Sequence, residues 1–363
     1  MGRVITEIEQ ITPSWLTQVL QQRGYLELGQ VTAVRSRDQQ HATAAGPGFQ
    51  PSHRLTVTYS DDASPAAPWQ LYVRIVDGAI FVQAGKLEVA FYTSIAPEMP
   101  YSPAVCCYDG AYYTATGAYH LLLQDVSETH RAVHPESPAP RNDAEQMLDA
   151  LARLHAYWWG HPRLGKDVGT LPTAESVRSD FTILKDAFPG YVDFLGDRLS
   201  PSRRGIYERV LARLPAFLVD HFAEHDRLTL VHNDAHAGNF LLANDPDQDS
   251  SYLIDWEQWG VWAGLRDVAY LIALFWYPER RARMERSLVR HYHTLLSGYG
   301  VIGYDWQTCW HDYRLHAIEN LFVPFWAWID KEWDGFRGYH RWHQLEKAML
   351  AFDDLGCAAL LEG

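Results

Sequence analysis

The first third of the chain alternates apolar and polar residues, as strands with one buried face do. A helix is expected before the strands, because Pro13 follows the capping residue Thr12 and Gly24 comes as a stop. Residues 84–96 carry apolar side chains at helical spacing, which predicts a second helix. Runs rich in Val, Thr, Leu and Tyr predict strands at residues 30–36, 54–59, 70–76, 104–108 and 119–126.

Helical spacing dominates after residues 127–142, where prolines and scattered charges indicate a surface connection. One β-rich stretch, 228–256, interrupts the helical pattern. We therefore predict an α+β fold, with a small β-rich N-terminal lobe at residues 1–125 and a larger, mostly helical C-terminal lobe at residues 126–363. Helices are predicted at residues 144–159, 174–187, 202–224, 264–276, 279–299, 306–333 and 338–361.

Composition and charge narrow the class of protein. Hydrophobic residues make up 47% and charged residues 21%, which is typical of a folded globular protein, and 363 residues suit two lobes. The formal net charge is −14 and no stripe of Lys and Arg is present, which argues against nucleic acid and anionic membrane as partners. No apolar run approaches the roughly 18 residues that span a bilayer or resembles a signal peptide. We expect a cytoplasmic monomer or homodimer.

Two acids and an amide stand where apolar strands end. The run LVHNDAHAGNFLL places Asp234 and Asn239 five residues apart, and YLIDWEQWG then places Asp255 after a second apolar run. Phosphoryl transfer needs one carboxylate to orient the attacking hydroxyl and accept its proton, and oxygen ligands to hold Mg²⁺. The five-residue step equals the spacing in the catalytic loop of protein kinases, so the combination predicts a kinase.

These motifs resemble those of the aminoglycoside phosphotransferase and choline kinase-like superfamily. Its loop reads H-[GN]-D-x-x-x-x-N and its metal strand I-D-[FW]-[EG], here HNDAHAGN and LIDWE. The likeness extends over nearly the whole chain, through a helix at 86–96, a hinge at 121–126 and a D-[LV]-A helix at 264–275. The resemblance implies a protein-kinase-like, two-lobed fold and an enzyme that phosphorylates small molecules with Mg-ATP.

The resemblance also implies roles for individual residues. Asp234 would be the catalytic base, Asn239 and Asp255 the Mg²⁺ ligands, and His232 a brace for the loop. The usual strand lysine is replaced by Arg74, which would pair with Glu88 and reach the phosphates, since arginine keeps the charge and binds carboxylates in a fork. Further nucleotide contacts would come from the backbone of Gln124, Asp125 and Val126 and from Gly46 and Gly48 over the phosphates.

Candidate residues for binding the phosphate acceptor lie mainly near the C-terminus. Aromatic residues and acids gather between 319 and 334, where most aromatics at helical spacing should form core, while some could line a pocket that suits a cation. Candidate contacts to a small hydroxylated acceptor are His236, Glu257, Glu319, Trp326 and Asp330.

The sequence is also compatible with other functions. Arg74 in place of lysine is compatible with a protein that binds nucleotide without turnover. His232, Asp234 and His236 could form a zinc cluster of a metal-dependent hydrolase. A protein kinase is disfavoured, because eleven residues between Asp255 and Asp267 leave little room for an activation segment. Asp267 is expected to brace the catalytic loop, and His155 to be a satisfied core histidine.

Overall fold

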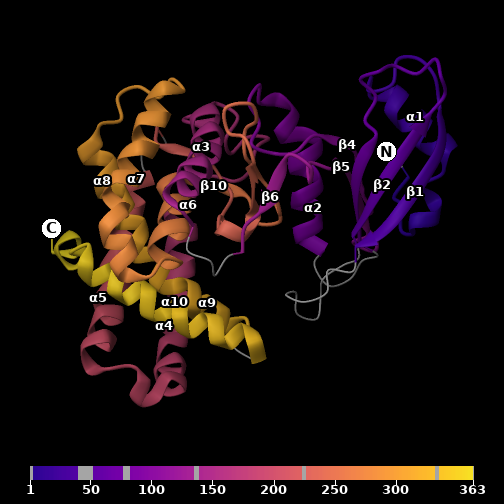
Figure 1. Ribbon diagram of the computed structural model, residues 1–363. Coiled ribbons are helices and arrows are strands. Elements are labelled where there is room, and N and C mark those ends of the chain that lie inside the picture. Colours follow the sequence, from indigo (N-terminus) through magenta and orange to yellow (C-terminus); the bar gives the residue numbers. More distant parts are fainter. Residues whose placement is uncertain are drawn as a thin grey trace. The chain divides into compact units, whose positions relative to one another are not determined.

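The computed structural model describes residues 3–39, 52–76, 82–134, 139–222, 226–331 and 335–362. The chain forms two compact units (Figure 1). Unit 1 comprises residues 1–131 and 243–259, and unit 2 comprises residues 132–242 and 260–363. The expected α+β class is confirmed, with the large sheet in the N-terminal part and most helices in the C-terminal part. Within the described residues, no helix is long and apolar enough to cross a membrane.

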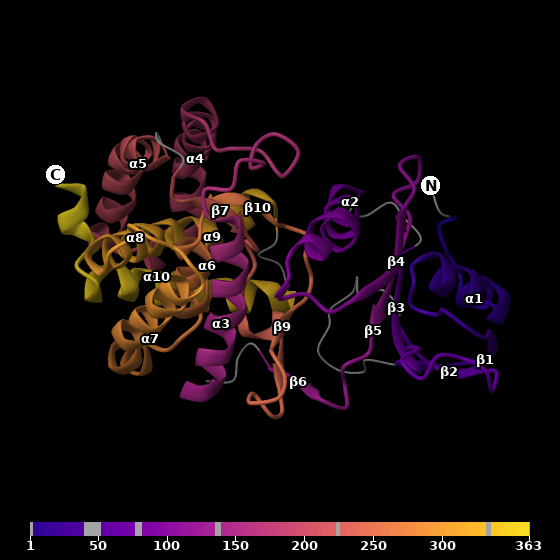
Figure 2. The same ribbon diagram turned by 90° about the horizontal axis from the view of Figure 1, so that it is seen from above.

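Unit 1 is built on an antiparallel sheet of five strands in the order β1-β2-β3-β5-β4. The helices α1 (Pro13–Gln22) and α2 (Val82–Ala90) lie on opposite sides of this sheet (Figure 2). The second helix continues as a π-helix, Phe91–Ile95. The strands are β1 (Val31–Gln39), β2 (Ser52–Tyr59), β3 (Gln70–Val76), β4 (Cys107–Tyr112) and β5 (Tyr119–Gln124).

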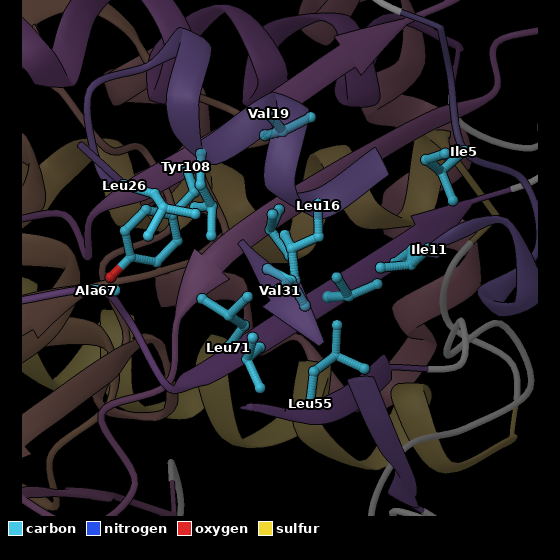
Figure 3. Packing of buried hydrophobic residues seen from close by; sticks show 14 of the residues in the cluster. Ile5, Ile11, Leu16, Val19, Leu26, Val31, Leu55, Ala67, Leu71 and Tyr108 are labelled. Atoms are coloured by element: carbon cyan, nitrogen blue, oxygen red, sulfur yellow. The ribbon is translucent and has the colours of Figure 1, made fainter. Parts of the chain in front are cut away.

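The period of two along β3 decides which residues face which helix. Leu71, Val73 and Ile75 are buried in the core that also receives Leu16 of α1 (Figure 3). Because successive side chains of a strand point to opposite faces, Arg74 lies on the other face, where it meets α2.

One strand prediction was displaced. The strand expected at 104–108 begins at Cys107, because the residues before it pair elsewhere. Ala104 forms an isolated parallel bridge with Leu253, and the Leu253 N–H donates to the Pro103 carbonyl at 2.6 Å. Leu253 belongs to β9 (Tyr252–Leu253), so this pairing ties the segment that carries Asp255 to unit 1.

Unit 2 is mostly helical, with a short antiparallel pair formed by β7 (Leu228–Val231) and β10 (Gly260–Ala263). Within it α3 packs against α7, α4 against α5, and α6 against α8. Short strands β6 (His130–Ala132) and β8 (Phe240–Ala243) lie where the chain passes between the units. The helices are α3 (Arg141–Trp158), α4 (Ala174–Leu195), α5 (Pro201–Phe222), α6 (Leu265–Ala269), α7 (Pro278–Gly298), α8 (Trp306–Glu319), α9 (Val323–Ile329) and α10 (Gly335–Asp354).

Four helix predictions need correction. The helix expected at 338–361 ends at Asp354, and a separate 3₁₀ helix, Cys357–Leu361, follows Gly356, whose φ of 60° interrupts the helix. The helix expected at 306–333 is broken into α8, a 3₁₀ turn at Asn320–Phe322 and α9, because Pro324 lacks the N–H of a continuous helix. The helix expected at 174–187 runs on to Leu195 and includes Pro189, since its apolar face continues to Tyr191 and Leu195. The helix expected at 264–276 is α6 followed by a π-helix, Tyr270–Leu274.

Candidate active site

The loop that carries the HND motif is held by one buried carboxylate. It leaves β7 at Val231 and re-enters regular structure as a 3₁₀ turn, Ala237–Asn239. The backbone N–H groups of His232 and Asn233 donate to Asp267 of α6, at 2.6 and 2.9 Å. Asn233 has φ 66°, a left-handed conformation that asparagine tolerates better than most residues. The expected brace at Asp267 is confirmed.

Asp267 is itself part of a buried chain of hydrogen bonds. Nε2 of His155 donates to its carboxylate at 3.2 Å, and Nδ1 of His155 accepts from the Tyr292 hydroxyl at 2.7 Å. Burial alone would raise the pKa of Asp267, but the hydrogen bonds from His155 and from the backbone of His232 outweigh it and lower that pKa. The prediction that His155 is a satisfied core histidine is confirmed.

The carboxylate of Asp234 is oriented from two sides. Its Oδ1 accepts from the hydroxyl of Tyr270 at 2.8 Å. The side-chain amide of Asn239 donates to the Asp234 carbonyl at 2.9 Å and approaches Oδ2 at 3.4 Å. The Asp234 N–H donates to Nδ1 of His232 at 3.3 Å.

Tyr270 was missed by the sequence analysis. It lies three residues after Asp267, and residues at that spacing share one face of a helix. A second polar group on the face of Asp267, within an otherwise apolar helix, was the signal that could have indicated it.

His236 stands beside the same carboxylate. Its Nε2 lies 3.8 Å from Asp234 Oδ2, its ring packs near Phe275, and its Nδ1 is buried without a hydrogen-bond partner. Among the described residues, no group of three or more His, Cys, Asp or Glu side chains could hold a metal ion. The zinc cluster considered for His232, Asp234 and His236 therefore does not form there.

In unit 1, aromatic packing sets the position of the IDWE segment. Trp256 is buried and stacks on Phe91 with ring centroids 3.6 Å apart. Nε1 of Trp259 donates to the carbonyl of Leu87 in α2 at 2.8 Å. Immediately before Trp256, Asp255 adopts φ 68°, in the left-handed region, where the short side chain of aspartate is tolerated. This packing brings the segment alongside the helix that carries Glu88.

Arg74 binds three carboxylates in this unit. Its Nη1 donates to Glu88 at 2.9 Å and to Asp255 at 3.2 Å, and its Nη2 donates to Glu257. A planar guanidinium presents several donors in a fork, which a lysine ammonium on one atom does not. The expected pairing of Arg74 with Glu88 is present, and Asp255 and Glu257 share the same cation.

Tyr119 of β5 closes the cluster. Its hydroxyl donates to Glu88 at 3.0 Å and lies 3.4 Å from Glu257. A Cβ at position 85 would stand 2.4 Å from the Tyr119 ring, so only glycine lets the ring approach α2 this closely. Tyr119 could not be identified from the sequence, because nothing local distinguishes it from its apolar neighbours.

The charges of this cluster shift one another. Burial, together with the carboxylates of Asp255 and Glu257, raises the pKa of Glu88 to about 7, although Arg74 opposes the shift. Burial also raises the pKa of Glu257 above its ordinary value. One guanidinium faces three acids, so a proton on Glu88 near neutral pH reduces the excess negative charge.

The predicted nucleotide hinge ends strand β5. The Gln124 N–H donates to the Cys106 carbonyl at 2.9 Å, and the Val126 carbonyl accepts from the N–H groups of Thr129 and His130. The Asp125 carboxylate accepts from the Ser127 N–H at 3.0 Å. These bonds fix the path of the hinge. The predicted phosphate-loop residues Gly46 and Gly48 lie outside the described residues.

The acceptor candidates near the C-terminus differ in exposure. Glu319 accepts from Nε1 of Trp262 at 3.3 Å and contacts His316, so its carboxylate is engaged inside unit 2. Trp326 is half-buried and Asp330 is exposed at the end of α9. Phe325 is fully buried and stacks on Tyr191, as expected for an aromatic at a core position.

Comparisons with known proteins agree with this architecture. The model of the phosphotransferase enzyme family matches residues 64–304. A candidate aminoglycoside phosphotransferase from Ralstonia eutropha is 14% identical, with 95% of this chain and 98% of that chain covered and a TM-score of 0.55. Plasmodium vivax ethanolamine kinase is 12% identical, with 87% and 82% covered and a TM-score of 0.51. No curated protein sequence matches the chain. The expected protein-kinase-like fold is confirmed.

Proposed function

Since the chain belongs to the phosphotransferase enzyme family, we propose that it transfers the γ-phosphoryl group of Mg-ATP to a hydroxyl of a small molecule, with Asp234 as the base. The observation that carries this proposal is the setting of Asp234. Its backbone lies in a loop held by Asp267, and its carboxylate is oriented by Tyr270 and Asn239. A base that must meet a hydroxyl in one geometry needs such support.

The proposed step is an in-line displacement. The acceptor O–H gives its proton to the Asp234 carboxylate, and the acceptor oxygen forms a bond to the γ-phosphorus. The bond between that phosphorus and the β–γ bridging oxygen breaks, and ADP leaves with the electron pair.

Asn239 and Asp255 would hold the Mg²⁺ ion, which when bound neutralises charge on the phosphates. Their chemistry fits a hard cation, because both offer oxygen atoms. Asn239 uses its NH₂ group on Asp234, which leaves the amide oxygen for a ligand. The Asp255 side chain is 41% exposed, so a cation from solvent can approach it.

The acceptor we propose is an alcohol such as an amino alcohol, an aminoglycoside-like compound or another natural-product alcohol. The ethanolamine kinase among the solved structures supports an amino alcohol only through its fold. Trp326 and Asp330 could offer an aromatic face and a carboxylate to a cationic group, with His236 beside the base and Glu257 near the phosphates. Glu319 would act by holding His316 and Trp262 in place.

A second candidate function is nucleotide binding without turnover. Arg74 favours it, because its donors are engaged by Glu88, Asp255 and Glu257 rather than left to phosphate. Both candidate functions require ATP binding, and they differ in whether an acceptor is phosphorylated.

Release of ADP from purified protein separates the candidates. With a panel of amino alcohols, aminoglycosides and sugar alcohols, acceptor-stimulated ADP release is expected. Asp234→Ala should reduce its rate roughly 10²–10⁴-fold. Asp249→Ala, which removes an exposed carboxylate between β8 and β9, serves as the matched control and should leave the rate unchanged.

Two outcomes would contradict the kinase proposal. Tight ATP binding without ADP release for any acceptor, unchanged in Asp234→Ala, supports binding without turnover. Zinc-dependent hydrolysis of phosphoesters that survives Asp255→Asn supports the hydrolase considered from the sequence.

A further inference from the structure

A short helical segment of unit 2 contacts the HND loop twice. Asp267 of α6 accepts from two backbone N–H groups of the loop, and Tyr270 reaches the side chain of Asp234. Tyr270 is the first residue of the π-helix Tyr270–Leu274, the point at which the helix leaves regular α geometry. Such local widenings of a helix occur frequently at functional sites. The segment thus holds both the backbone of the loop and the reacting group it presents.

The Tyr270 hydroxyl is a donor at neutral pH. Burial and the neighbouring Asp234 carboxylate raise the pKa of Tyr270 well above its ordinary value, so the hydroxyl is protonated at neutral pH. The ring is fixed by packing against Phe275, with centroids 5.2 Å apart. A protonated hydroxyl on a packed ring holds the Asp234 carboxylate in one orientation.

The two oxygens of Asp234 therefore differ. Oδ1 has a hydrogen bond of 2.8 Å from Tyr270. Among the described residues, the contacts of Oδ2 are longer, 3.4 Å to the amide nitrogen of Asn239 and 3.8 Å to Nε2 of His236. The oxygen with the weaker contacts is the one with a lone pair available to an incoming O–H.

We infer that Tyr270 is a positioning residue for the proposed phosphoryl transfer, holding Oδ1 of Asp234 so that Oδ2 receives the proton of the acceptor. The inference rests on the proposed function. The groups that face this pair are His236 and Asn239 from the loop and Arg341 from α10, whose positive charge acts on Tyr270. None of these three groups donates to Oδ1, so none of them replaces the hydrogen bond when the Tyr270 hydroxyl is removed.

The test compares Tyr270→Phe with Tyr313→Phe. Tyr313 of α8, which is fully buried, likewise donates to a carboxylate, Glu285, at 2.7 Å, so its variant loses a similar bond elsewhere in unit 2. With the best acceptor, Tyr270→Phe should lower kcat about tenfold and leave KM for ATP unchanged. KM for the acceptor should also stay unchanged, because the Tyr270 hydroxyl orients the base and does not bind the acceptor. Tyr313→Phe should keep both kcat and KM.

A double-mutant cycle tests the bond without any acceptor. Urea midpoints of Tyr270→Phe, Asp234→Ala and the double variant should be non-additive, with the double variant unfolding close to the less stable single one. Additive midpoints, or a kcat for Tyr270→Phe equal to that of the wild type, would overturn the inference while the kinase activity stands. An equal loss of kcat in Tyr270→Phe and Tyr313→Phe would reduce Tyr270 to a structural residue. Absence of turnover in the wild type and in Tyr313→Phe alike would remove the proposed function, and this inference with it.

Discussion

Glu88 shows how the environment of one residue decides its charge. It is fully buried on α2, and the sheet residue Arg74 donates to it. Asp255 and Glu257 also accept hydrogen bonds from the Arg74 guanidinium, so three carboxylates share one cation. Burial and these acids together raise the pKa of Glu88 to about 7. Over the pH range between the unfolded and folded pKa values, Glu88 is therefore more often protonated in the folded protein than in the unfolded chain.

This residue gives the fold a dependence on pH. An unfolded glutamate has a pKa near 4.3, so between about 4.5 and 7 the folded state binds more protons at Glu88, and the contribution of Glu88 to stability falls as pH rises. Glu88→Gln removes that contribution. The free energy of unfolding of the variant, relative to the wild type, should rise across this window and level off above it, as measured by urea unfolding at pH 5, 6, 7 and 8.

The control for that prediction is Glu346→Gln. Glu346 pairs with Arg203, whose hydrogen bond lowers the pKa of Glu346, so its titration lies below the window. The difference between this variant and the wild type should be flat from pH 5 to 8. A flat difference for Glu88→Gln as well would show that Glu88 is ionised throughout.

At the scale of elements, the HND loop is stable because α6 supplies acceptors for it. A loop that leaves a short strand has backbone N–H groups without ladder partners, and burial of such groups is unfavourable unless they are bonded. Asp267 satisfies those of His232 and Asn233, and His155 of α3 holds Asp267 in turn. One side chain thus connects two helices and the loop.

Asp267→Asn should destabilise the protein by roughly 2–4 kcal/mol. The amide keeps one acceptor oxygen, but its NH₂ group faces donors and the charge that attracts His155 is gone. Urea unfolding at pH 7 measures the change, with Asp353→Asn on the exposed side of α10 as a control within about 0.5 kcal/mol. A loss under 1 kcal/mol for Asp267→Asn would mean that water or another group can replace the carboxylate.

At the scale of the whole molecule, the chain returns to its first unit late in the sequence. Residues 243–259 group with residues 1–131, held by the pairing of Leu253 with Pro103 and Ala104 and by Trp256 on Phe91. Unit 1 therefore contains the predicted adenine hinge, the Arg74–Glu88 pair and the proposed metal ligand Asp255. A nucleotide that contacts these groups should stabilise segments far apart in the sequence.

Hydrogen exchange can detect that effect. With Mg²⁺ and a non-hydrolysable ATP analogue, amide exchange should slow at least twofold in peptides covering 120–127 and 252–259, because ligand binding reduces local opening. Peptides from α8 provide the internal comparison and should change little. Protection confined to α8, or none at saturating analogue, would contradict nucleotide binding in unit 1.

Much of the fold follows from local spacing. Periods of two and of 3.6 residues indicated the strands and most helices, because an element that buries one face places apolar residues at the period of its own backbone. The HND loop and the IDWE segment were also readable, since five residues between Asp234 and Asn239 is a local property. Element ends were less accurate wherever tertiary packing changed them, as at β4 and in the π-helix after α6.

The sequence by itself determined the elements, the family resemblance and the residues proposed for chemistry, because each depends on residue type and short spacing. Only the tertiary structure decided which side chains support them. Tyr270 meets Asp234 across 36 residues, and Arg74 meets Asp255 across 181. Contacts of that separation depend on how helices and sheet pack, and hydrogen-bond geometry at 3 Å is too short-ranged for any sequence pattern to specify.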